Sequence, residues 1–142
     1  MQDCELCNSI DEDYRVISEN DSCFCILNLE PIKEGHVMIL PKRHIQSMEE
    51  MTEKESKDFF KLADQMIRLI ERIYSNKAII FFNSSGLKTQ NHIHAHIVYL
   101  KEGLREVLSK SEKTPTRRRA QKNELELVKN FIRNHQEFKT II

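Results

Sequence analysis

The stretch His92-Ile93-His94-Ala95-His96-Ile97-Val98 restricts the possible folds of this chain more than any other. Histidines alternate with apolar residues, and successive side chains of a β-strand point to opposite faces of a sheet. The pattern therefore predicts a strand with its three imidazoles on one face and Ile93, Ala95 and Ile97 in the core. A run of surface histidines on an edge strand is the alternative.

The spacing limits what these histidines can bind. At roughly 3.3 Å per residue, His92 and His96 lie roughly 13 Å apart, so one metal ion with bonds of about 2 Å cannot bind all three imidazoles. Two neighbouring histidines could share a metal if a further ligand came from elsewhere. The other use is nucleophilic and acid–base chemistry, in which each ring has a separate role.

Composition indicates an ordinary globular protein. The chain has 142 residues, enough for one domain with a hydrophobic core. Its formal net charge is zero, so no bulk attraction to nucleic acid or to a membrane is expected. No apolar run approaches the roughly 20 residues of a membrane span, and the N-terminal residues do not resemble a signal peptide. We expect a cytoplasmic protein that binds neither membranes nor nucleic acid.

Four cysteines are then more typical of thiols or metal ligands than of disulfides. Cys4 and Cys7 form a CxxC motif, which occurs in zinc sites and in redox dithiols. No strand precedes the motif, which favours a zinc half-site that needs two further ligands. Cys23 and Cys25 alternate with apolar residues and are interpreted as packed thiols.

Apolar runs and turn residues predict five strands and one long helix. The segment Thr52-Glu53-Lys54-Glu55 has the form of a capping box, and apolar residues then follow at helical spacing to about Tyr74. That helix should pack one face on the sheet. The predicted strands cover residues 14–18, 23–29, 37–40, 78–82 and the histidine stretch 92–100.

The remainder of the chain, residues 104–142, is predicted to be a helical extension packed on the domain formed by residues 1–103. Leu104–Leu108 should form a short helix. Thr114 and Pro115 resemble an N-cap followed by proline at the first helical position, so a second amphipathic helix should run from there to about His135.

The histidine stretch resembles the signature of the histidine triad (HIT) superfamily of nucleotide hydrolases and nucleotidyl transferases. The resemblance covers about residues 4–100. It implies an α+β, HIT-like fold with an antiparallel sheet of about five strands. It also implies a homodimer and a purine nucleotide substrate.

The resemblance assigns roles to individual residues. His94 would be the nucleophile that attacks the α-phosphorus, and His96 would bind phosphate oxygens and help to transfer protons. Thr89 would lie near the leaving group, although it could be only a turn hydroxyl. The segment 28–41 resembles the superfamily pattern Asn-x-x-Pro-x-x-x-Gly-His, in which Asn28 would contact the ribose; alternatively, Asn28 only caps a turn. His36 is interpreted as structural.

Two further sets of residues follow from the resemblance. Asn83 is similar to an asparagine near the phosphate site, and Lys88 stands where many relatives have glutamine and could contact polyphosphates. Zinc-containing bacterial-type members bind zinc through CxxC and two histidines. The matching residues here are Cys4, Cys7, His44 and His92. A closed Cys₂His₂ set predicts structural zinc, since no ligand position stays open for catalysis.

Some features depart from the family pattern. The loop from Asn83 to His92 is about two residues shorter than in well-known members, and Leu100-Lys101 stands where Pro-Arg is common. The predicted function is hydrolysis or transfer at the α-phosphate of dinucleoside polyphosphates or nucleoside phosphoramidates, through a nucleotidyl intermediate on His94. One alternative is a catalytically weak nucleotide-binding module. The other is a metallohydrolase that uses His92 and His94 on an open metal site.

Overall fold

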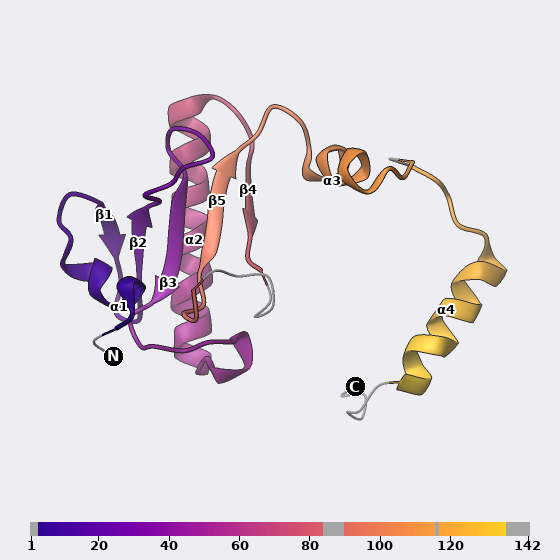
Figure 1. Cartoon of the computed structure of the whole chain (residues 1–142), viewed down its shortest axis with the longest axis horizontal. Helices are drawn as coiled ribbons and strands as arrows, with labels where there is room; N and C mark the ends of the chain where they lie inside the picture. Colours follow the sequence, from indigo (N-terminus) through magenta and orange to yellow (C-terminus); the bar gives the residue numbers. More distant parts are fainter. Residues whose placement is uncertain (1–2, 84–89, 116, 136–142) are drawn as a thin grey trace. The chain divides into compact units, whose positions relative to one another are not determined.

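A computed structural model of the chain describes residues 3–83, 90–115 and 117–135. Five strands form one antiparallel sheet in the order β1-β2-β3-β5-β4 (Figure 1). The α+β class and the five-stranded antiparallel sheet predicted from the sequence are confirmed. The strands are β1 (Val16–Glu19), β2 (Cys23–Leu27), β3 (Val37–Pro41), β4 (Ala78–Phe81) and β5 (Ala95–Tyr99).

One face of the sheet packs on helix α2 (Glu53–Tyr74). The predicted capping box is present, because the Thr52 hydroxyl accepts from the Glu55 backbone N–H and the Glu55 carboxylate accepts from that of Thr52. Ser75 ends the helix in a left-handed conformation. The core beneath α2 contains Cys23, Cys25, Val37, Ile39, Ala95 and Ile97 from the strands, and Phe59, Leu62, Ala63, Met66 and Ile70 from the helix.

The opposite face of the sheet is covered by the N-terminal segment. That segment forms α1 (Glu5–Asn8) and the 3-10 helix η1 (Ser9–Asp11). Leu6 from α1 packs with Phe24, Ile26, Met38 and Leu40, the strand residues that alternate with those facing α2. Because this cluster takes its strand residues from β2 and β3, the same face of β5 and β4 is left open for a site.

Three strand predictions need correction by two residues or more at one end. Strand β1 begins at Val16 and not at residue 14. Strand β5 begins at Ala95, so His92 and His94 precede the strand instead of lying in it. Strand β2 ends at Leu27 and not at residue 29, since the chain turns there into the loop that carries Asn28.

The chain divides into two compact units, Met1–Leu104 and Arg105–Ile142. Helix α3 (Leu104–Glu112) is longer than predicted, and α4 (Lys122–His135) ends where predicted. The predicted start at Thr114 and Pro115 is wrong, because these two residues are not helical. Packing of the extension on the domain stays a prediction. No helix in the described parts of the chain is long and apolar enough to cross a lipid bilayer.

Candidate active site

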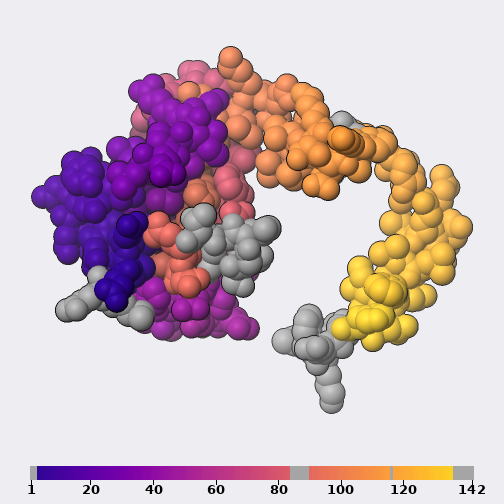
Figure 2. Space-filling model, viewed as in Figure 1, coloured from indigo at the N-terminus to yellow at the C-terminus, as the bar shows by residue number. Residues whose placement is uncertain are grey.

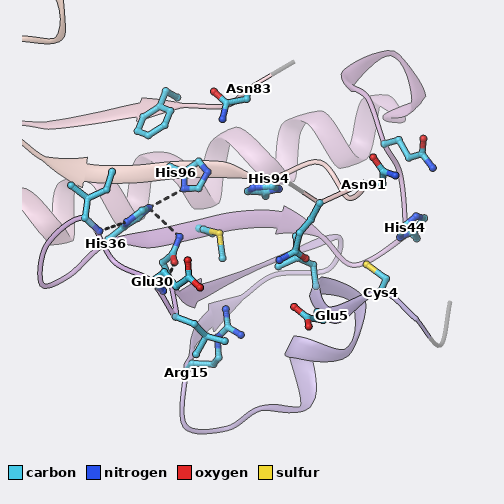
Figure 3. A pocket seen from close by; sticks show the side chains of 18 of the residues that line it. Cys4, Glu5, Arg15, Glu30, His36, His44, Asn83, Asn91, His94 and His96 are labelled. Atoms are coloured by element: carbon cyan, nitrogen blue, oxygen red, sulfur yellow. Dashed lines mark hydrogen bonds between the residues drawn. The ribbon is translucent and has the colours of Figure 1, made fainter. Parts of the chain in front are cut away.

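A cavity of about 1270 Å³ lies on the face of the sheet opposite α2. The sheet register explains its position: Met38 of β3 pairs with His96 of β5, and His96 pairs with Phe81 of β4. These three side chains line the cavity together with His94. Figure 3 shows His94 and His96 side by side, next to His36.

His94 is held in one tautomer by its own backbone. The Nδ1 atom of His94 lies 2.7 Å from the carbonyl oxygen of His92, and a carbonyl can only accept, so Nδ1 carries the proton and donates it. The Nε2 atom of the neutral ring therefore has its lone pair available. His94 is only 8% exposed, and the cavity is lined by this ring. Such a fixed, basic nitrogen is suited to nucleophilic attack.

His96 is oriented by His36 through a chain of hydrogen bonds. The backbone N–H of Ile32 donates to Nδ1 of His36 over 3.1 Å, which places the proton of a neutral His36 on Nε2. That nitrogen lies 2.9 Å from Nδ1 of His96 and donates to it. The remaining proton of His96 is then on Nε2, so this ring can donate a hydrogen bond to a bound group. Phe81 stacks on the other side of the His96 ring at 4.9 Å.

Burial keeps these two imidazoles neutral. The pKa of His96 is lowered to about 4, first by burial and then by the charges that His94 and His36 can carry. Burial also lowers the pKa of His36. At neutral pH both rings can therefore keep the tautomers that the hydrogen bonds require.

His36, interpreted from the sequence as structural, contacts His96 in the folded chain and lines the cavity. The sequence offered only the equal parity of His36 and Met38 as a signal, because the pairing of Met38 with His96 is a property of the folded chain. His36 and Met38 are two positions apart and share a face, and Met38 pairs with His96. His36 is thus a member of the histidine cluster that sequence reasoning missed.

Two predicted substrate contacts line the cavity. The Asn28 side-chain oxygen accepts from the Glu30 backbone N–H at 2.7 Å, and its Nδ2 lies 3.4 Å from Nε2 of His36. Asn28 therefore caps a turn and also faces the site. Asn83 lines the cavity as well. Three further carboxamides line the cavity without having been predicted from the sequence: Gln46, Gln90 and Asn91. Lys88 and Thr89 lie outside the described residues.

The four predicted metal ligands are close together. The Nδ1 atom of His92 lies 3.6 Å from Sγ of Cys4 and 3.4 Å from Sγ of Cys7, and Nδ1 of His44 lies 3.2 Å from Sγ of Cys7. All four ligand atoms lie within 4.8 Å of one another. A tetrahedral ion with Zn–S and Zn–N bonds of typical length would separate sulfur from nitrogen by about 3.6 Å. The cluster could therefore hold a metal ion.

His92 is oriented for this cluster by its second nitrogen. Its Nε2 donates to the carbonyl oxygen of Pro41 at 2.9 Å, so Nδ1 of the neutral ring is available to a metal. The ring is fully buried. Figure 2 shows the N-terminal segment (indigo) directly against the segment that enters β5 (salmon), the two segments that the cluster joins.

His92 and His94 thus have different surroundings. His92 contacts two thiols and the His44 ring, whereas Nδ1 of His94 donates to a carbonyl group. The buried Cys23 and Cys25 are packed thiols, as predicted, and burial raises the pKa of each to about 12.

Comparison with known proteins connects this chain to a family. An AP-4-A phosphorylase of Mycobacterium tuberculosis (strain CDC 1551 / Oshkosh) is 28% identical over 92 residues, which cover 62% of this chain and 47% of that protein. A bis(5'-adenosyl)-triphosphatase of Dictyostelium discoideum is 30% identical over 78 residues, covering 53% of this chain and 52% of that protein. The chain thus spans about half the length of these relatives.

Solved structures share the fold. A member of the HIT family from Bacillus subtilis superposes with a TM-score of 0.69 at 16% identity, over 96% of this chain and 99% of that one. The protein SMU.412c from Streptococcus mutans superposes with a TM-score of 0.71 at 18% identity, over 94% and 85% of the two chains. Residues 10–103 match the family model described as HIT domain, and this chain therefore belongs to the HIT domain family.

Proposed function

We propose that this protein is a nucleotide hydrolase or nucleotidyl transferase that acts at an α-phosphate through a covalent intermediate on His94. The observation that carries the proposal is the tautomer of His94, whose Nδ1 donates to the His92 carbonyl and leaves Nε2 as the nucleophile. Relatives named AP-4-A phosphorylase, bis(5'-adenosyl)-triphosphatase and bis(5'-nucleosyl)-tetraphosphatase support the same class of chemistry.

In the first step the Nε2 lone pair of His94 attacks the α-phosphorus. A phosphorus–nitrogen bond forms, and the bond from phosphorus to the leaving oxygen or nitrogen breaks with its electron pair. The hydrogen bond to the His92 carbonyl stabilises the positive charge that develops on the ring. Neutral His96 keeps its proton and donates a hydrogen bond from Nε2 to a phosphate oxygen or to the leaving group, which takes any proton it needs from solvent.

In the second step water, or another acceptor, displaces His94 from phosphorus. The new phosphorus–oxygen bond replaces the bond to Nε2, and the proton of the acceptor passes to a basic group of the site or to solvent. An imidazole suits this sequence because it attacks without adding negative charge and then leaves readily.

Around this centre, we assign the ribose to Asn28 and the phosphates to Asn83 and Lys88. Thr89 would lie near the leaving group. Substrates of this class are dinucleoside polyphosphates and nucleoside phosphoramidates, each with a phosphate between a nucleoside and a leaving group. The predicted homodimer and the cytoplasmic location stay predictions.

Turnover of an adenosine phosphoramidate and of a diadenosine polyphosphate tests the proposal. The native protein should release AMP, and His94→Ala should lower the rate at least a thousandfold, because the covalent route is lost. The matched control is His135→Ala, which changes a histidine of α4 and should keep native activity. Acid-quenched native protein should carry a nucleotidyl group that His94→Ala lacks. Binding of both substrates without turnover would refute the proposed enzymatic activity and favour a nucleotide-binding module.

The metal cluster has a separate structural role in this proposal. Cys4, Cys7, His44 and His92 would bind one zinc ion as a closed set and connect the N-terminal segment to the entrance of β5. The sulfur–nitrogen separations of 3.2–3.6 Å fit that geometry. When bound, zinc would supply folding energy and no open ligand position for substrate.

Metal analysis of purified protein tests this role. Native protein should contain one zinc per chain, and Cys7→Ala should contain much less. Cys25→Ala removes a thiol outside the cluster and should keep the metal. Full metal content in Cys7→Ala, or none in native protein purified with zinc, would contradict the site.

A further inference from the structure

The cavity continues beyond the histidines into a second region, here called the distal lobe. It is formed by Glu5, Leu6, Arg15, Leu29, Glu30 and Met38. Figure 3 shows Arg15, Glu5 and Glu30 on one side of His94 and His96, and Asn83 on the other. The Asn28 side chain contacts both His36 and the backbone of Glu30, so under the proposed function the ribose would lie next to this lobe. A nucleobase attached to that ribose would occupy the distal lobe.

Backbone pairing explains why these residues meet. The Leu27 backbone N–H donates to the Arg15 carbonyl at 2.9 Å, so Arg15 lies beside the end of β2. Leu29 and Glu30 follow shortly after that strand end in the chain. Leu6 packs with Met38 in the second core cluster. Three segments that are distant in sequence therefore border one end of the cavity.

Two hydrogen bonds fix the Arg15 side chain in position. Its side chain is only 7% exposed. Its Nε donates to the Leu27 carbonyl at 3.0 Å, and its Nη1 donates to the Glu12 carboxylate at 2.9 Å. Neither acceptor is among the described residues that line the cavity, whereas Arg15 is.

Donors of this guanidinium remain for a ligand. An arginine side chain has five N–H donors, and no hydrogen bond among the described residues uses Nη2 of Arg15. A buried cation that is fixed by two bonds and lines a cavity is preorganised to donate to an acceptor there, at little further cost in conformational entropy.

The rest of the distal lobe suits a flat ring with a polar edge. Leu6 and Met38 are buried beneath the cavity, while Leu29 is 63% exposed and Ile32, which also lines the cavity, is 65% exposed. Such apolar side chains can pack against the faces of an aromatic ring. The carboxylates of Glu5 and Glu30 line the same cavity and lie on the same side of the histidines as Arg15 (Figure 3), where they add hydrogen-bond acceptors.

We propose that the distal lobe selects guanine, an inference that rests on the proposed nucleotide function. Guanine presents acceptors at O6 and N7, which match an arginine fork, and donors at N1–H and the exocyclic amino group, which match a carboxylate. Adenine presents an amino group where guanine has O6, so a donor would face the guanidinium. Sites built from buried polar groups discriminate strongly against a ligand that leaves them unpaired.

Calorimetric titration of the native full-length protein with GMP, IMP and AMP tests the inference. GMP should bind at least tenfold more tightly than AMP. IMP, which keeps O6 and N1–H but lacks the amino group, should bind with intermediate affinity. Equal affinities for GMP and AMP would overturn guanine selection while leaving the proposed function intact. If none of the three nucleotides binds, the proposed function and this inference both fail.

Substitutions locate the discrimination. Glu5→Gln and Glu30→Gln change exposed side chains, so the variants should fold, and at least one should weaken GMP binding severalfold while IMP binding changes less. Arg15→Lys should reduce the preference for GMP over AMP, because an ammonium group cannot reproduce the fork. Glu53→Gln, on α2 and outside the cavity, is the matched control and should bind all three nucleotides as the native protein does. An unchanged preference in all three lobe variants would refute the assignment.

Discussion

His96→Asn should remove a pH-dependent part of the stability of this protein. The folded-state pKa of His96 is about 4, lowered by burial and by neighbouring histidines, whereas an unfolded chain titrates near its ordinary value of about 6.5. Between these values the unfolded chain binds more protons than the folded one, so stability falls as the pH falls. The full stability is present above pH 6.5, and the loss is complete near pH 4.

The size of the effect follows from the two pKa values. Linkage gives a loss of about 2 kcal/mol between pH 7 and pH 5, and at most about 3 kcal/mol in total. Lowering of the His36 pKa acts in the same direction. In the variant, the contribution of His96 disappears, so the difference in unfolding free energy between native protein and variant should depend on pH.

Urea denaturation at pH 7, 6 and 5 measures this difference directly. Between pH 7 and pH 5, the unfolding free energy of the native protein should fall by about 2 kcal/mol more than that of His96→Asn. His135→Asn replaces a histidine of α4 as a control and should reproduce the native pH dependence. A native-minus-variant difference that stays constant with pH would refute a buried, neutral His96.

Three further substitutions test local features of the structure. Gly35 has φ of +81°, and a Cβ atom there would lie 2.6 Å from Cζ of Tyr74, so Gly35→Ala should destabilise the protein by about 2 kcal/mol or more in urea denaturation. Thr52→Ala removes the hydroxyl that accepts from the Glu55 N–H and should lower the unfolding free energy by about 1 kcal/mol, measured the same way. In zinc-loaded protein, Cys7→Ala should lower the midpoint temperature of thermal unfolding. Excess chelator should lower the midpoint of the native protein but hardly change the midpoint of the variant.

Local patterns were sufficient for much of the fold. The capping box at Thr52 and the apolar spacing after it located α2 at both ends, since a cap and a 3.6-residue period are properties of the chain itself. Alternation located the strands, and their ends were less certain because pairing partners decide where a strand stops. The start of α4 was missed by seven residues, since Pro115 was predicted as the first helical position and the helix begins at Lys122. Thr114 and Pro115 have suitable local chemistry for a helix start, yet the chain first becomes helical again at Lys122.

Identity of the chemical groups was a property of the sequence, and their mutual arrangement was a property of the folded chain. The histidine stretch and the CxxC motif singled out His92, His94, His96, Cys4 and Cys7, because unusual residue types at fixed spacing are visible without any structure. His44 was added to the metal-ligand candidates by the resemblance to the HIT superfamily. Pairing of β3 with β5 brought His36 against His96, over a separation of 60 residues. The same sheet placed Arg15 at the far end of the cavity. Residues so far apart meet only through strand register and packing, so only the tertiary structure could decide the tautomers of the histidines and the second lobe of the site.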